Sequence, residues 1–156
     1  MINDDKRYKE VSDALSYGGI GNAPRDKWMT MPDMGFLFAH KFNQMVVVLS
    51  FGKGRSETYF PLCGPLPPPS IDPLISLAYV NDNHFMALDL KYGCLIPPTC
   101  GLWRQYHWAD VDSYTYRYAS RMADYNELSR AAGVEVIEDD EESGDGGRWR
   151  KGITYG

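Results

Sequence analysis

The sequence has no long apolar run and few cysteines. No apolar run approaches the roughly 18 residues that a membrane-spanning helix requires, and the first residues, MINDDKRYKE, lack the apolar centre of a secretory signal peptide. The three cysteines, Cys63, Cys94 and Cys100, are an odd number, which favours reduced thiols over a disulfide framework. These absences predict an intracellular protein, cytoplasmic or nuclear, without a membrane partner.

Basic clusters are also absent. The chain of 156 residues has 16 Lys and Arg against 21 Asp and Glu, a formal net charge of -5, and its basic residues are scattered. A surface that binds phosphates needs clustered positive charge, so we expect no nucleic-acid partner. With 44% hydrophobic residues, the composition is that of one globular domain with a sizeable core.

Apolar periodicity predicts two helices before the first strand. Tyr8, Val11 and Leu15 share one face of a helix that ends at the glycines of YGGIGNAP. A second helix is predicted in TMPDMGFLFAHKFN, where Thr30 and Asp33 resemble a capping box. Its predicted apolar face consists of Met34, Leu37, Phe38 and Phe42.

Four strands are predicted to form a sheet. The β-branched run at 45–50 is typical of a strand buried on both faces, and 57–62 is expected to pair with it. Residues 74–80 and 84–90 flank a polar turn at 81–83 whose Asn and Asp residues tolerate left-handed backbone, which predicts a hairpin.

The rest of the chain is divided by proline and glycine. The segments CGPLPPPSIDP and KYGCLIPPTCG are predicted loops. The aromatic spacing from Trp103 to Tyr125 predicts one or two helices that end at Gly133. Residues 134–156 are acidic and glycine-rich, which predicts a disordered tail after a domain at 1–133.

His84 follows the polar turn and begins the last predicted strand. A general base suits this place, because strand backbone fixes the ring while the turn leaves one ring nitrogen open to a cleft. A histidine beside a polar turn is more often a surface residue or a satisfied hydrogen-bonding group. The position alone leaves both interpretations open.

Four segments carry a resemblance to a known family. They are KWMTMPDMGFLFAHKFNQMVVVLSF, TYFPLCGPLPPP, ISLAYVNDNHFMALDLKYGCLIPP and a Trp-bearing segment that ends in YASRM. Over residues 8–125 the chain resembles the OTU-like cysteine protease domain of plant proteins related to Mutator-like transposons, most specifically in WMTMPDMG and NHFMALDLK. The resemblance implies an α+β fold with helices on a small central sheet. It also implies a ubiquitin or ubiquitin-like partner that is cleaved from conjugates.

The resemblance assigns roles to the residues around the turn. The family's general base is a histidine followed by an aromatic residue at the start of a late strand, and His84 and Phe85 match this motif. The tail of ubiquitin would lie in a groove beside the turn, so Asn83 and Phe85 are the expected substrate contacts. Many members carry Asn or Asp two positions after the histidine, where this chain has Met86.

The family's nucleophile has no counterpart here. OTU domains place it in an Asp-Gly-x-Cys-type segment before the region that aligns with Trp28, and residues 1–27 contain no cysteine. Cys100 is the best physical substitute, because TCGLW would place it at a helix start whose dipole favours a thiolate. A buried, unreactive cysteine is the alternative. A zinc site of Cys94, Cys100 and His107 matches no common spacing, so we expect no metal or other cofactor.

Two functional hypotheses follow. In the first, the chain is an OTU-like deubiquitinase domain that lacks its N-terminal catalytic segment and is inactive in this form, because the thiolate performs the chemistry. In the second, it is a non-catalytic pseudo-protease or transposon-derived remnant that at most binds ubiquitin or another protein. An in-frame Asp-Gly-x-Cys segment upstream of Met1 would favour the first.

Overall fold

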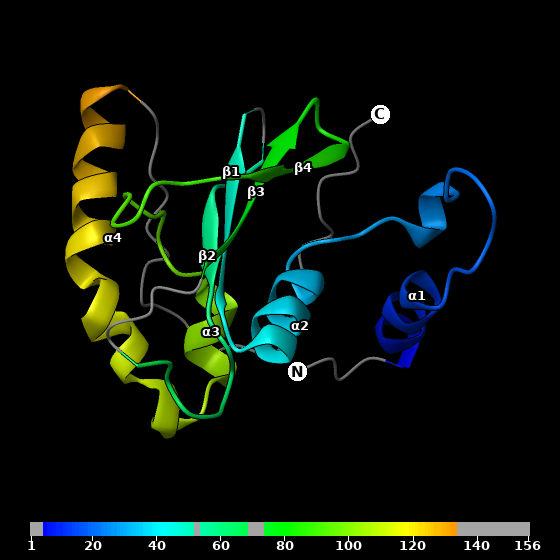
Figure 1. The fold of residues 1–156 in the computed structure, drawn as a ribbon, viewed down its shortest axis with the longest axis horizontal. Helices are drawn as coiled ribbons and strands as arrows, with labels where there is room; N and C mark the ends of the chain where they lie inside the picture. The colour runs from blue at the N-terminus through cyan, green and yellow to red at the C-terminus, as the bar shows by residue number, and fades with distance from the viewer. Residues whose placement is uncertain (1–4, 52–53, 69–73, 134–156) are drawn as a thin grey trace, which may run out of the picture.

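A small mixed β-sheet lies between two groups of helices (Figure 1). The computed structural model describes residues 5–51, 54–68 and 74–133. Within them the sheet has four strands in the order β2-β1-β3-β4, with α2 on one face and α3 and α4 on the other. The predicted α+β class is therefore confirmed. The tail predicted at 134–156 lies outside the described residues.

The predicted helices and strands are present, with shorter bounds in places. The helices are α1 (Asp5–Leu15), α2 (Asp33–Phe42), α3 (Gly101–Tyr106) and α4 (Ser113–Ala131), with 3-10 turns η1 (Arg25–Lys27) and η2 (Ala109–Val111). The strands are β1 (Met45–Ser50), β2 (Glu57–Tyr59), β3 (Leu74–Val80) and β4 (His84–Leu88). None of the helices in the described part of the chain has the length and apolarity that a membrane span requires.

β1 is central in the sheet because its first four residues, 45–48, are apolar and buried on both faces. It pairs antiparallel with β2, as predicted, and parallel with β3, so that Val47 lies between Thr58 and Ser76. β3 and β4 form the predicted antiparallel hairpin. β2 ends at Tyr59, shortly before Pro61, whose nitrogen has no hydrogen to donate to a neighbouring strand.

The two faces of the sheet carry separate hydrophobic clusters. The cluster on the α3–α4 face, of which half the residues are aromatic, consists of Met45, Val47, Phe60, Ile96, Trp103, Val111, Tyr114 and Tyr118. The cluster on the α2 face consists of Ala39, Val46, Val48, Tyr59 and Cys100. Alternate residues of β1 enter the two clusters, as the two-residue period of a strand requires. The central strand is thereby anchored on both sides.

The predicted apolar face of α1 is wrong. Val11 is buried, but Tyr8 and Leu15 are 65% and 58% exposed. The helix is held instead by polar contacts, because Arg7 Nε donates to Asp33 Oδ2 of α2 at 2.6 Å. Periodicity identified the helix correctly but could not reveal that an ion pair attaches it to α2.

The predicted start and face of α2 also need correction. Thr30 does not cap the helix: the N-cap is Pro32, without a side-chain hydrogen bond, and Thr30 Oγ1 accepts from Arg7 Nη2 at 3.2 Å. The buried residues are Met34, Gly35 and Ala39, whereas the predicted Leu37 and Phe42 are exposed. Gly35 lies directly against the ring of Tyr59, which leaves no space for a side chain at that position.

The hydroxyl of Tyr114 is buried without a hydrogen-bond partner in the described part of the chain. Tyr114→Phe should therefore raise the free energy of unfolding by about 1 kcal/mol at pH 7, because an unpaired buried polar group is removed. Tyr59→Phe should lower it, because the buried Tyr59 hydroxyl donates to Glu57 Oε2 at 2.7 Å. Urea denaturation of both variants measures whether the free energy of unfolding rises in Tyr114→Phe and falls in Tyr59→Phe. A loss of stability in Tyr114→Phe would contradict this account.

The stability of Tyr114→Phe should also differ from that of the wild type in its dependence on alkaline pH. Burial, and secondarily the neighbouring Tyr118, raises the pKa of Tyr114 from 10.0 to about 12. The folded state therefore keeps this proton where the unfolded chain releases it, so the wild-type protein loses stability as the pH rises from 10 toward 12. Tyr114→Phe should lose less stability than the wild type over this interval.

Candidate functional site

His84 is the first residue of β4, at an outer edge of the sheet. It lies opposite Val80 across the β3–β4 hairpin, and its side chain is exposed. Because side chains alternate along a strand, His84 shares a face with Met86 and Leu88, on the α3–α4 side of the sheet. The predicted base therefore stands where a partner molecule can reach its ring.

The turn before His84 has the backbone that the sequence predicted. Asn81 and Asp82 have φ angles of 54° and 55°, in the left-handed region that Asn and Asp tolerate better than most residues. The hydroxyl of Tyr79 donates to the carbonyl of Asp82 and ties the turn to β3. The strand pairing and this bond together fix the backbone that carries the histidine.

The two predicted substrate contacts differ in their environment. Asn83 is exposed beside His84. Phe85 is half-buried on the opposite face of the sheet, where its ring centroid lies 4.8 Å from that of Tyr79. Phe85 thus anchors the hairpin, and Asn83 is the one that lies open beside the histidine. Met86 is 51% exposed and offers an imidazole only a thioether sulfur, which is a weak hydrogen-bond acceptor.

The other two histidines have contacts for their ring nitrogens. His107 Nδ1 lies 2.7 Å from the carbonyl oxygen of Trp103, and Nε2 lies 2.6 Å from Asp112 Oδ1. His40 Nδ1 lies 4.0 Å from Cys63 Sγ. The ring of His84 makes no hydrogen bond to any residue that the structure describes. Among the three histidines, His84 is therefore the one whose ring nitrogens both lack a contact with the described residues.

Cys100 lies just before α3, as predicted, but at the opposite edge of the sheet from His84. Its amide donates to the carbonyl of Thr58 at 2.9 Å, and a bridge between Thr99 and Thr58 places the segment beside β2. Since β1 and β3 separate β2 from β4, the lateral separation of Cys100 and His84 is on the order of 19 Å, or four strand spacings. Cys100 is also buried. The structure does not bring the predicted base and the predicted substitute nucleophile together.

The remaining cysteines also have neighbours other than His84. Arg121 of α4 donates from Nη2 to Cys94 Sγ at 3.4 Å. The contact of Cys63 with His40 was not predicted, because 23 residues separate the two and no local motif joins them. They meet because α2 packs on β2, and Cys63 follows that strand. The three cysteines, all in described residues, form no disulfide.

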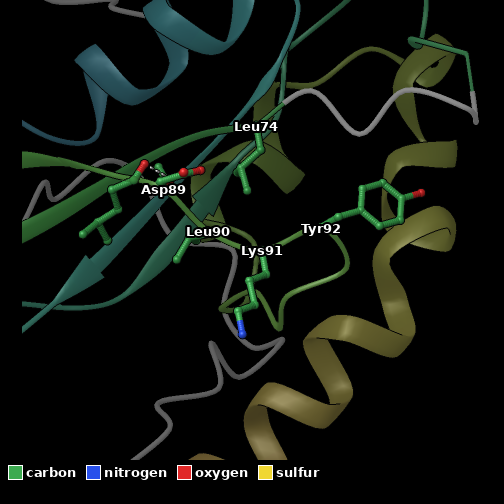
Figure 2. A pocket seen from close by; sticks show the side chains of 7 residues that line it. Leu74, Asp89, Leu90, Lys91 and Tyr92 are labelled. Atoms are coloured by element: carbon green, nitrogen blue, oxygen red, sulfur yellow. Dashed lines mark hydrogen bonds between the residues drawn. The ribbon is translucent and has the colours of Figure 1, made fainter.

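A cleft of about 220 Å³ opens at the other end of the β3–β4 hairpin (Figure 2). It is lined by Leu74, Ser76, Leu88, Asp89, Leu90, Lys91 and Tyr92. His84 is not part of it, since Ser76 and Leu88 pair four residues away from His84 along the hairpin. The volume is below the roughly 300–1,000 Å³ that is typical of small-molecule sites. In the ranges that the structure describes, no group of three His, Cys, Asp or Glu side chains could hold a metal ion.

The geometry leaves an exposed base without a neighbouring thiol. His84 stands on a fixed strand, and within the described residues no cysteine sulfur lies within hydrogen-bonding distance of its ring. The His84 ring can exchange a proton with a bound partner or form a hydrogen bond to it. It cannot form a thioester, because this requires a thiol beside it. Comparison of the chain with protein-family models, with curated proteins and with solved structures finds no match.

Proposed function

We propose that this chain is the histidine-bearing part of an OTU-like, ubiquitin-directed cysteine protease domain, and that in this form it binds its partner without cleaving it. His84 takes the position of the general base. The exposed His84 ring at the start of edge strand β4, with no partner in the described residues, is the observation that carries the proposal. An intracellular location, cytoplasmic or nuclear, belongs to the same proposal.

The edge of the sheet supports a protein partner with an extended segment. In the described residues β4 pairs on one side only, with β3, so its outer backbone groups have no strand beside them. The strand sequence HFMAL contains none of the prolines, lysines or other charges that usually block pairing at an edge. An extended peptide can add a strand at such an edge, and its backbone would then pass His84 and Met86.

The absence of a nearby sulfur supports binding over catalysis. In a cysteine protease the histidine acts by deprotonating the thiol and protonating the leaving amine. Cys100 is separated from His84 by the width of the sheet, and Cys63 and Cys94 contact other side chains. The chain therefore has a base but not the pair that the reaction needs.

The experiment that tests the lack of catalysis uses ubiquitin carrying a C-terminal thiol-reactive electrophile. We expect the intact mass of the purified chain to show no adduct that depends on His84. His84→Ala is the control, because its exposed side chain can be removed without disturbing the core. An adduct that forms with the wild type and disappears in His84→Ala would mean that the chain is an active protease.

A further inference from the structure

We propose that Cys63 and His40 form a second chemical site, in which a thiol with its own base reacts with low-molecular-weight disulfides. Cys63 lies in the loop after β2, and His40 lies in the last turn of α2. Cys63 Sγ and His40 Nδ1 are 4.0 Å apart, and such pairs are often longer than an ideal hydrogen bond until a substrate binds. His40 is exposed and Cys63 is partly exposed, so a small reagent can reach them.

The loop that carries Cys63 is held on both sides of the cysteine. Before it, the carbonyl of Leu62 accepts a hydrogen bond from the amide of Trp108 at 2.8 Å. After it, the carbonyl of Pro65 accepts from Asn43 Nδ2 at 3.0 Å. Asn43 is the C-cap of α2, the helix that carries the histidine. The hydrogen bond from Asn43 therefore holds the Cys63 loop against α2, which keeps Cys63 Sγ close to His40 Nδ1.

The place of His40 suits the charge that it would carry during the reaction. The C-terminal end of a helix has a partial negative charge that interacts favourably with a cation. α2 is 10 residues long, and His40 is in its last turn. Transfer of the Cys63 proton to His40 would thus create an imidazolium at the favourable end of the helix, beside the thiolate.

The surroundings of the thiol favour a disulfide over an acyl substrate. Acyl transfer requires hydrogen-bond donors for the oxyanion that forms. The amide of Gly64 already donates to Asp110 Oδ2 at 3.1 Å, and the side chain of Asn43 donates to the Pro65 carbonyl. Thiol–disulfide exchange passes through no oxyanion and needs only a thiolate and a proton for the departing thiol.

The reaction balances with these two residues and the disulfide alone. His40 Nδ1 takes the proton of the Cys63 thiol when the ring carries its own proton on Nε2. The thiolate attacks one sulfur of the reagent, so that a bond forms between this sulfur and Cys63 Sγ and the reagent's sulfur–sulfur bond breaks. The departing thiolate takes the proton back from His40. Cys63 is oxidised to a mixed disulfide, and one half of the reagent is reduced to a thiol.

The test measures the rate of adduct formation with bis(2-hydroxyethyl) disulfide, an uncharged reagent, at pH 7. Intact mass gives the rate, and peptide mapping gives the modified residue. The proteins are the wild type and Cys94→Ser, each with and without His40→Gln. We expect the adduct on Cys63, and we expect His40→Gln to slow it by about tenfold or more, because glutamine cannot accept the proton of the thiol.

Tyr116→Gln is the control, since it places glutamine at a side chain of α4 that is 82% exposed and belongs to neither proposed site. Its rate should equal that of the wild type. A His40→Gln rate within twofold of its parent, or an adduct on Cys94 or Cys100 with none on Cys63, would overturn the proposal. The assay contains no ubiquitin and does not involve His84, so its result is independent of the function proposed above.

Discussion

Replacing Trp103 with alanine should lower the free energy of unfolding by about 3–5 kcal/mol, the range for deletion of a large buried aromatic side chain. Trp103 is 1% exposed in the α3–α4 cluster, and its ring lies 3.9 Å from that of His107 and 5.6 Å from that of Phe60, between centroids. Its indole nitrogen also donates to the buried carbonyl of Pro61 at 2.9 Å. The substitution removes both the packing and this hydrogen bond.

Trp108→Ala is the matched control for this prediction. Trp108 lies five residues further along the chain but is 65% exposed, so its removal should change the stability by no more than about 0.5 kcal/mol. Urea denaturation followed by circular dichroism gives both values. Equal effects of the two substitutions would mean that α3 does not pack on the sheet as described.

Gly35→Ala should also destabilise the fold strongly, by about 2–3 kcal/mol, because it overpacks the contact between α2 and the sheet. A Cβ at this position would lie 2.7 Å from Cγ of Tyr59. Tyr59 cannot move easily, since it is 1% exposed and its hydroxyl donates to Glu57. The helix would have to shift away from β2, which outweighs the gain in helix propensity of about 1 kcal/mol.

Gly18→Ala provides the comparison, because no heavy atom lies within 4 Å of a Cβ built there. The free energy of unfolding of Gly18→Ala should stay within about 0.5 kcal/mol of the wild-type value. The midpoint of urea denaturation separates the two cases. If Gly35→Ala were as stable as Gly18→Ala, the close approach of α2 to Tyr59 would be refuted.

The sheet could be predicted from the sequence because its signals are local. The buried run at 45–48 and the turn at Asn81 and Asp82 each specify their own backbone, and the structure has both. The faces of α1 and α2 could not be predicted in the same way. They depend on Arg7 reaching Asp33 and on Tyr59 filling the space beside Gly35, and both contacts join residues far apart in the sequence.

The candidate sites also differ in how far the sequence alone could predict them. The place of His84 at the start of a strand followed from the turn before it. The separation of Cys100 from His84 depends on strand order, because β3 pairs with β1 and leaves β2 and β4 at opposite edges. The contact of Cys63 with His40 likewise exists only after α2 has packed against β2. Pairings between elements carry no local signal in one sequence.

The most direct test of the central claim is a titration of isotope-labelled ubiquitin with this chain, followed by chemical shifts. We predict saturable shifts in a contiguous surface that includes the ubiquitin C-terminal tail. Met86→Asp, at the exposed centre of β4, should weaken binding at least about tenfold, the effect of burying an unpaired charge in an interface. Leu128→Asp, at a 61% exposed position of α4, should leave it unchanged. Absence of shifts at millimolar concentration, or equal effects of both substitutions, would contradict the assignment of ubiquitin binding to the His84 edge.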